Sequence, residues 1–261
     1  VFDVCSYGTC AAYIATNALT NKRWIVDRDP LQLEQIGGNW DTLRNCTVDD
    51  LYADSKRNLC IYGAPGRWEV MQVASVQDGV ATGIIRGLRG TEQYCGLHEV
   101  NDKVYLINTA LIYEKRDFDY IGRTDVIKGV SFWEKFASKT GTNVVVTGAS
   151  LMPFAPYYIK AVEDEASGDV TVTWLRRDRS APNVLAGEAP MIEDDEVYEI
   201  DIIVSNAVVR TVKGITTPTW VYTFEDRETD GTDEAPTLHL KIYQISAVIG
   251  RGFPGECVAN V

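Results

Sequence analysis

Short runs of alternating polar and apolar residues, separated by turn signals, are the feature that most limits how this chain can fold. Residues 169–175 (Asp-Val-Thr-Val-Thr-Trp-Leu) alternate so that Val170, Val172 and Trp174 share one face of a strand. Residues 196–202 repeat the pattern. Further strands are predicted at residues 208–212, 220–224 and 238–245. A period of two predicts antiparallel strands with one buried face, and about seven such strands in about a hundred residues indicate a β-sandwich.

The first half of the chain also carries strand signals. Residues 67–73 follow a Pro-Gly turn and residues 80–85 follow an Asp-Gly hairpin signal, so the two runs are expected to pair. A third strand is predicted within residues 100–106. Helical signals are few. Thr47 is a suitable N-cap for a short helix at 48–51, and residues 131–138 could form a turn or two.

A domain boundary is predicted at residues 149–156, where two prolines lie within four positions. The fold class expected is therefore mainly β, with a β-rich domain at residues 1–150 and a β-sandwich at residues 155–261. These sizes lie within the usual range for domains. The chain begins at Val1 with no secretion signal after it, which predicts a processed piece or a part of something longer.

The net charge argues against two classes of partner. The 261 residues include 37 acidic and 25 basic side chains, a net charge of −12. A nucleic-acid-binding protein needs a basic face for phosphate contacts, and an anionic membrane repels a chain with this excess of acid. The chain has no run of 18 apolar residues, so no membrane span is expected.

Six cysteines are present, and five lie within the first 95 residues. They are Cys5, Cys10, Cys46, Cys60, Cys95 and Cys257. One or two disulfides in the first half are one interpretation, in which Cys5 or Cys10 pairs with Cys46 or Cys60. Buried free thiols are the other, and the sequence does not fix the pairing. Cys257 is alone in the second half and is expected to be reduced and buried.

No catalytic, cofactor-binding or metal-binding residue is predicted. The two histidines are His98, which we interpret as a loop residue beside the structural thiol of Cys95, and His239, which is expected to face outward from a strand. Neither a Gly-x-Ser-x-Gly nor a His-Glu-x-x-His motif occurs. Residues 226–234 place acids as in a calcium loop, but Thr237 stands where the final glutamate is required. A solvated acidic loop is the preferred interpretation of that segment.

From about residue 157 to residue 261 the chain resembles a fibronectin type III domain. Trp174 stands where that family places its core tryptophan, and Tyr198 matches the aromatic residue of its third strand. Residues 240–252, which include Tyr243, resemble the sixth strand and the glycine-rich turn after it. The resemblance implies that Trp174, Tyr198 and Tyr243 form the core between two facing sheets.

The most specific string in the chain is Ile-Ile-Arg-Gly-Leu-Arg-Gly-Thr-Glu at residues 84–92. The residues that carry it are Arg86, Gly87, Arg89, Gly90, Thr91 and Glu92. Glycines in this pattern permit a tight turn with positive φ angles, the arginines can pair with Glu92 or bond to backbone carbonyls, and Thr91 can bond within its own turn. A phosphate cradle is the less favoured interpretation, because the Walker pattern is absent.

This string, followed by a fibronectin-like end, resembles the C-terminal region of the "megatron" tail-tip and baseplate hub proteins of siphophages and gene transfer agents. The match covers roughly residues 60–110 and 155–261. It implies a non-enzymatic structural protein at the tail tip of the virion, often trimeric, that contacts other baseplate proteins and contributes to host attachment. A host receptor or surface glycan is a further partner that the resemblance allows.

Two other functions were weighed from the residues. A carbohydrate-binding module would stack sugars on exposed aromatic rings, and Trp24, Trp40 and Trp133 lie outside the clear strand patterns, whereas Trp174 and Trp220 are expected in the core. A glycan or peptidoglycan hydrolase would need a pair of carboxylates across a cleft, and the sequence offers no way to choose one.

Overall fold

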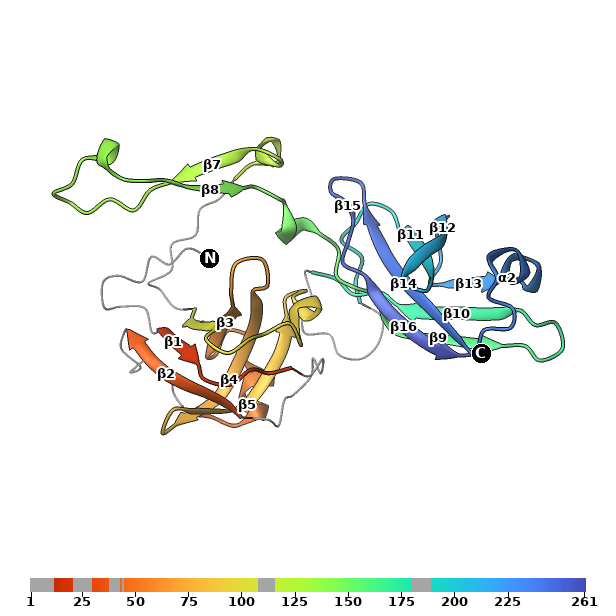
Figure 1. Cartoon of the computed structure of the whole chain (residues 1–261), viewed down its shortest axis with the longest axis horizontal. Helices are drawn as coiled ribbons and strands as arrows, with labels where there is room; N and C mark the ends of the chain where they lie inside the picture. Colours follow the sequence, from red (N-terminus) through yellow and green to blue (C-terminus); the bar gives the residue numbers. More distant parts are fainter. Residues whose placement is uncertain (1–11, 21–29, 38–42, 44, 108–115, 180–188) are drawn as a thin grey trace. The chain divides into compact units, whose positions relative to one another are not determined.

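A computed structural model describes residues 12–20, 30–37, 43, 45–107, 116–179 and 189–261 (Figure 1). The chain divides into two compact units, residues 1–150 and 151–261, and the division falls inside the two-proline stretch. Both units are built mainly from β-strands, which confirms the predicted fold class.

The first unit contains a closed barrel of six antiparallel strands in the order β1-β2-β5-β4-β3-β6. The barrel strands are β1 (Ala12–Ala15), β2 (Leu31–Gly37), β3 (Leu59–Gly63), β4 (Glu69–Gln77), β5 (Val80–Leu88) and β6 (Lys103–Leu106). The predicted pairing of the two long runs is confirmed, since β4 and β5 pair from Val70↔Leu88 to Gln77↔Val80. Closure itself was not predicted. It depends on β1, which pairs with both β2 and β6.

Inward-facing side chains of all six strands fill the barrel. Tyr62, Met71 and Ile84 are among the fully buried members of this core. Helix α1 (Val48–Ala53) begins at Thr47, whose side chain accepts from the backbone N–H of Asp50, so the predicted cap is confirmed. Its buried residue, Leu51, packs in a separate small cluster against the barrel wall.

A separate two-stranded hairpin follows in the same unit. Strands β7 (Thr124–Ile127) and β8 (Thr142–Val145) pair with each other. The described residues of this unit also form short 3₁₀ turns at η2 (Glu92–Tyr94), η3 (Phe118–Tyr120) and η4 (Phe136–Ser138), and η5 (Ala149–Leu151) spans the boundary with the second unit. The turn structure expected at 131–138 is therefore present, with 3₁₀ rather than α geometry.

The second unit is a β-sandwich of two antiparallel sheets. One sheet has the order β13-β10-β9, built from β9 (Tyr157–Glu163), β10 (Val170–Leu175) and β13 (Thr219–Tyr222). The other sheet has the order β12-β11-β14, with β16 and the short β15 also paired to β14. Its strands are β11 (Tyr198–Val204), β12 (Ala207–Ile215), β14 (Thr237–Ser246), β15 (Gly250–Arg251) and β16 (Gly255–Asn260). Helix α2 (Phe224–Asp230) joins β13 to β14.

The sandwich core contains two of its three expected aromatic residues. Trp174 and Tyr198 are buried and meet edge to face, with ring centroids 5.1 Å apart. The prediction for Tyr243 is wrong. Leu240 and Ile242 face the core from β14, so the odd-numbered Tyr243 points to the opposite face, where the Arg251 guanidinium lies 4.3 Å from its ring centroid.

Candidate functional site

The specific string at residues 84–92 forms the end of β5 and the turn that follows it. Gly87, Arg89 and Gly90 all have positive φ angles, of 64°, 55° and 76°. A Cβ atom on Gly87 would lie 3.0 Å from the backbone of Glu92, so glycine is required at this turn. Thr91 Oγ1 donates to the Leu88 carbonyl and accepts from the Val70 N–H at 2.9 Å. The local bonding predicted for Thr91 therefore also joins the turn to β4.

The partner of Arg86 that sequence reasoning missed is Glu69, on the neighbouring strand β4. The guanidinium binds both carboxylate oxygens, with Nε–Oε1 at 3.0 Å and Nη2–Oε2 at 2.6 Å. The Gly87 N–H donates to the same carboxylate at 2.8 Å. Both side chains are fully buried. Arg89 is exposed, and the described residues show no ion pair between it and Glu92, which was one of its two predicted kinds of partner.

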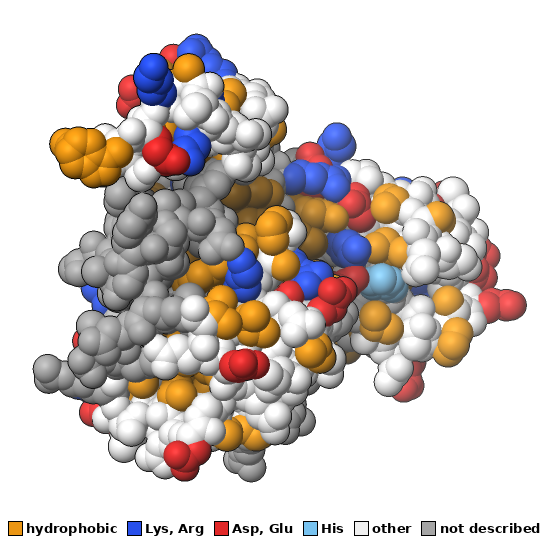
Figure 2. All heavy atoms as spheres, turned by 60° about the vertical axis from the view of Figure 1, so that its left-hand side comes forward, with side chains coloured by type: hydrophobic (Ala, Val, Ile, Leu, Met, Phe, Trp, Pro, Cys, Tyr) orange, Lys and Arg blue, Asp and Glu red, His pale blue; other side chains and the backbone are white. Residues whose placement is uncertain are grey.

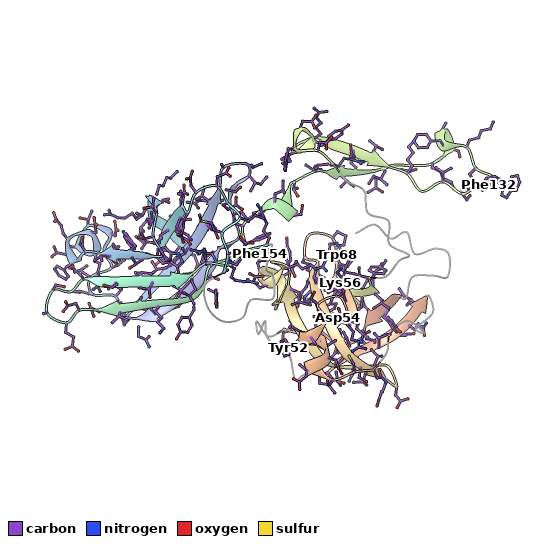
Figure 3. All side chains as sticks on the ribbon, turned by 180° about the vertical axis from the view of Figure 1, so that it is seen from behind. Tyr52, Asp54, Lys56, Trp68, Phe132 and Phe154 are labelled. Atoms are coloured by element: carbon purple, nitrogen blue, oxygen red, sulfur yellow. The ribbon has the colours of Figure 1, made fainter. Side chains whose placement is uncertain are left out.

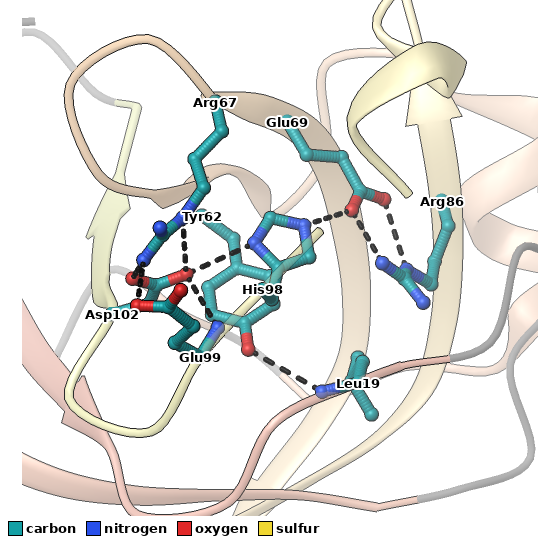
Figure 4. Close-up of polar contacts among 8 residues, drawn as sticks. All are labelled: Leu19, Tyr62, Arg67, Glu69, Arg86, His98, Glu99 and Asp102. Carbon is teal, nitrogen blue, oxygen red and sulfur yellow. Dashed lines mark hydrogen bonds and ion pairs between the residues drawn. The ribbon is translucent and has the colours of Figure 1, made fainter. Parts of the chain in front are cut away.

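His98 extends this pair into a larger buried network (Figure 4). Its Nε2 lies 2.7 Å from Glu69 Oε2, and its Nδ1 lies 3.2 Å from Asp102 Oδ2. Each ring nitrogen therefore lies within hydrogen-bonding distance of a buried carboxylate. The Tyr62 ring stacks on the imidazole with centroids 3.9 Å apart. His98 lies in the loop before β6, as expected, but its side chain is buried and bonds to Glu69 and Asp102.

The outer end of the network reaches solvent through Arg67. Its guanidinium binds the Asp102 carboxylate with two nitrogens and reaches Glu99 Oε2 at 3.1 Å. Asp102 also accepts from the Glu99 N–H at 3.1 Å. We call the six residues Arg67, Glu69, Arg86, His98, Glu99 and Asp102 the ionic clamp. It joins three separate parts of the chain: the start of β4 with the loop before it, β5, and the loop before β6.

The electrostatics of the ionic clamp keep its carboxyl groups ionised. Desolvation by burial raises the pKa of Glu69, but hydrogen bonds from His98 and Arg86 outweigh it and hold that pKa below its ordinary value. For Asp102, desolvation is likewise outweighed, chiefly by the hydrogen bond from Arg67, and the pKa is lowered. The neighbouring thiol of Cys95 behaves oppositely, because burial and the Glu69 charge raise its pKa. The charged groups of the ionic clamp thus compensate one another, and the clamp presents no nucleophile to solvent.

Acid is expected to destabilise the barrel through these two carboxyl groups. Their folded-state pKa values lie below the unfolded values of about 4, so the stabilisation is complete above that pH and is lost as the pH falls through the folded values. Urea unfolding at pH 7 and at pH 3, followed by hydrogen exchange of residues 59–107, measures the loss. An unchanged unfolding midpoint for the barrel at pH 3 would contradict the assignment.

Four cysteines are described, and all four are free thiols: Cys46, Cys60, Cys95 and Cys257. The disulfide interpretation therefore fails for Cys46 and Cys60, while Cys5 and Cys10 lie outside the described residues. Burial raises the pKa of Cys60 to about 12. Cys257 is reduced as expected but only half-buried.

The acidic segment 226–234 is not a loop throughout. Its first half belongs to helix α2 (Phe224–Asp230), which is capped by Thr223 at its N-terminus and by Gly231, in the left-handed conformation, at its C-terminus. Asp226 and Asp230 bind the Arg210 guanidinium at 2.7 Å and 2.6 Å. In the described part of the chain no cluster of three or more metal-ligating side chains occurs, and no helix is long and apolar enough to cross a membrane. His239 faces outward and lies 2.9 Å from Glu256 on β16.

Among the tryptophans predicted as candidates for sugar binding, one forms an exposed aromatic site. Trp133, in the loop between β7 and β8, is 90% exposed. Trp24 and Trp40 lie outside the described residues. Trp220 packs at the edge of the sandwich core, where it stacks on Tyr222 with centroids 5.1 Å apart. The described residues thus present both a buried ionic clamp and an exposed aromatic side chain in the loop between β7 and β8.

Comparison with known proteins identifies no family for this chain. No family model matches it, and no curated protein matches it. Among solved structures, a match is found to domains d3–d4 of the rat CD45 extracellular region, at 13% identity and a TM-score of 0.29. It covers 60% of this chain and 72% of that one. A similarity this weak carries no argument about function.

Proposed function

We propose that this chain is a structural component of the tail tip or baseplate of a tailed phage or phage-like particle, where it contributes to tail assembly and host attachment. The observation that carries the proposal is the order of two features: the Arg-Gly string of residues 84–92 in a β-domain, and a fibronectin type III-like sandwich after it. That order is the one found in the resembling tail-tip proteins.

The geometry of the string supports a scaffolding role. Arg86 and Thr91 each bond to β4, so the string fastens its turn to the barrel wall instead of opening a site. A closed barrel and a two-sheet sandwich are stiff supports, and stiff supports hold exposed loops in fixed positions for contact with partners. In this proposal the chain acts without catalysis, as part of a trimer in contact with other tail-tip proteins, and its exposed loops meet the host surface.

Immunogold electron microscopy of purified particles tests the proposal. An antibody raised against the purified chain is expected to place gold at the tail tip. The same antibody, absorbed beforehand with the chain, provides the control and should leave the particles unlabelled. Label on the capsid, or particles that lack the chain altogether, would refute the proposal.

A further inference from the structure

The loop between β7 and β8 presents two large aromatic rings to solvent. Phe132 is 91% exposed and Trp133 is 90% exposed, and their rings meet edge to face with centroids 4.9 Å apart. Figure 3 shows Phe132 at the far end of the hairpin loop, pointing away from the strands. Two adjacent aromatic residues exposed to this degree mark an interaction site, since scattered surface apolar residues are normal but concentrated ones are not.

Local hydrogen bonds fix the loop that carries these rings. Glu134 N–H donates to the Ser131 carbonyl at 3.0 Å, and Ser131 Oγ donates back to Glu134 Oε2 at 2.5 Å. Lys139 lies 2.5 Å from the other carboxylate oxygen. Together the Lys139 and Ser131 hydrogen bonds lower the pKa of Glu134 to about 2. Phe132 and Trp133 are the two central residues of this turn, so the rings are displayed by a preorganised structure.

The charge around the rings is opposite to that of the chain. Residues 126–150 contain three lysines, Lys128, Lys135 and Lys139, against one acid, Glu134, a local charge of +2 in a chain of −12. The Lys128 ammonium lies 4.6 Å from the centroid of the Phe136 ring, which is itself 65% exposed. Figure 2 shows apolar side chains projecting beside basic ones at the top of the view, on the hairpin.

We propose that this tip, residues 128–139, binds a phospholipid membrane surface, with Phe132 and Trp133 inserted at the interface and the lysines near the lipid phosphates. Aromatic rings are enriched at the level of the headgroups, where an apolar ring meets water. Lysines close to an anionic leaflet add electrostatic attraction. The −12 net charge opposes membrane docking of the chain as a whole, and the local +2 charge confines attachment to the tip.

The geometry favours lipid over a sugar ligand. The two rings are inclined at 86°, so they form no flat platform on which a sugar could stack across both. The polar side chains of the turn, Ser131 and Glu134, are occupied by each other and by Lys139. A convex apolar tip with basic neighbours matches a lipid interface, which conforms to the group that enters it. The inference stands apart from the tail-tip proposal, because immunogold labelling does not depend on lipid binding.

Vesicle flotation with the full chain tests the inference. Phosphatidylcholine vesicles are prepared with and without about one third phosphatidylglycerol. The chain is expected to float with the anionic vesicles, and replacement of Phe132 and Trp133 by Ser is expected to weaken binding at least about tenfold. Lys128→Glu combined with Lys135→Glu is expected to weaken binding to the anionic vesicles specifically.

A matched control removes exposed apolar surface elsewhere. Tyr158 and Val162 on β9 are 62% and 63% exposed, and their double replacement by Ser should leave flotation unchanged. Urea unfolding midpoints verify that each variant folds. Absence of flotation by the unaltered chain, or equal flotation of the Phe132/Trp133 variant, would overturn the inference. Binding to a glycan array that requires Trp133, without flotation, would also overturn it and would assign the tip to sugar.

Discussion

Replacing Glu69 by Gln is expected to reduce the free energy of unfolding of the barrel by about 3–5 kcal/mol, because it removes one partner of a buried ion pair. Arg86 is fully buried and receives its charge compensation from the two Glu69 oxygens. The amide of the introduced glutamine has one neutral oxygen acceptor, whereas the Glu69 carboxylate has two charged ones. The amide NH₂ group is itself a donor and would face the donors of Arg86 and His98. The desolvation cost of the buried Arg86 guanidinium is unchanged, but fewer and weaker hydrogen bonds offset it.

The measurement is urea unfolding of the full chain, with hydrogen exchange to assign each transition to the barrel or the sandwich. Glu99→Gln provides the matched control. Glu99 belongs to the same ionic clamp and pairs with Arg67, but its side chain is 72% exposed, so a loss below about 1 kcal/mol is expected. If both substitutions reduced the free energy of unfolding equally, burial would not determine how much each residue of the ionic clamp contributes to stability.

Replacing Trp174 by Ala is expected to destabilise the sandwich by about 3–5 kcal/mol, since it leaves a large cavity between the two sheets. Trp174 is 2% exposed and packs against Tyr198, with residues of the opposite sheet around it. Urea unfolding assigned to residues 157–261 measures the loss.

Tyr243→Ala is the comparison that separates core from surface. The Tyr243 ring lies on the outer face of β14 under Arg251, and loss of that contact should cost only on the order of 1 kcal/mol. Trp174→Phe, which keeps an aromatic ring in the core, is expected to give an intermediate loss. A Tyr243→Ala loss as large as that of Trp174→Ala would contradict the assigned faces of β14.

The strands were predicted well because the alternation of polar and apolar residues and the turn-forming residues are local signals that span only a few positions. The same reasoning placed Thr47 at a helix N-terminus. The prediction for Tyr243 failed because it rested on the aromatic character of the residue and not on its position in the strand. Leu238, Leu240 and Ile242 already define the inner face of β14. Helix α2 was not predicted, although Thr223 and Gly231 are residue types suited to the N-cap and C-cap of a helix.

The ionic clamp lay beyond sequence reasoning because its contacts are long-range. The string at 84–92 singled out Arg86, but its partner Glu69 precedes it by 17 residues and looks like the solvent-facing end of a strand. His98 was read beside Cys95, its neighbour in sequence, whereas its bonds are to Glu69 and Asp102. The detectable signal was an acidic residue at the start of β4 and an arginine near the end of β5, the strand that pairs with it.

The strand order of the barrel also dictates the sequence of events as the chain leaves the ribosome. Strand β6 is the last of the six to be synthesised, and it fills the gap between β1 and β3. Until residues 103–106 emerge, β1 and β3 each keep a row of unpaired backbone groups that a second nascent chain could pair with. A chain truncated before residue 103 is therefore expected to expose the unpaired edges of β1 and β3, whereas a chain that includes β6 is expected to have both edges paired.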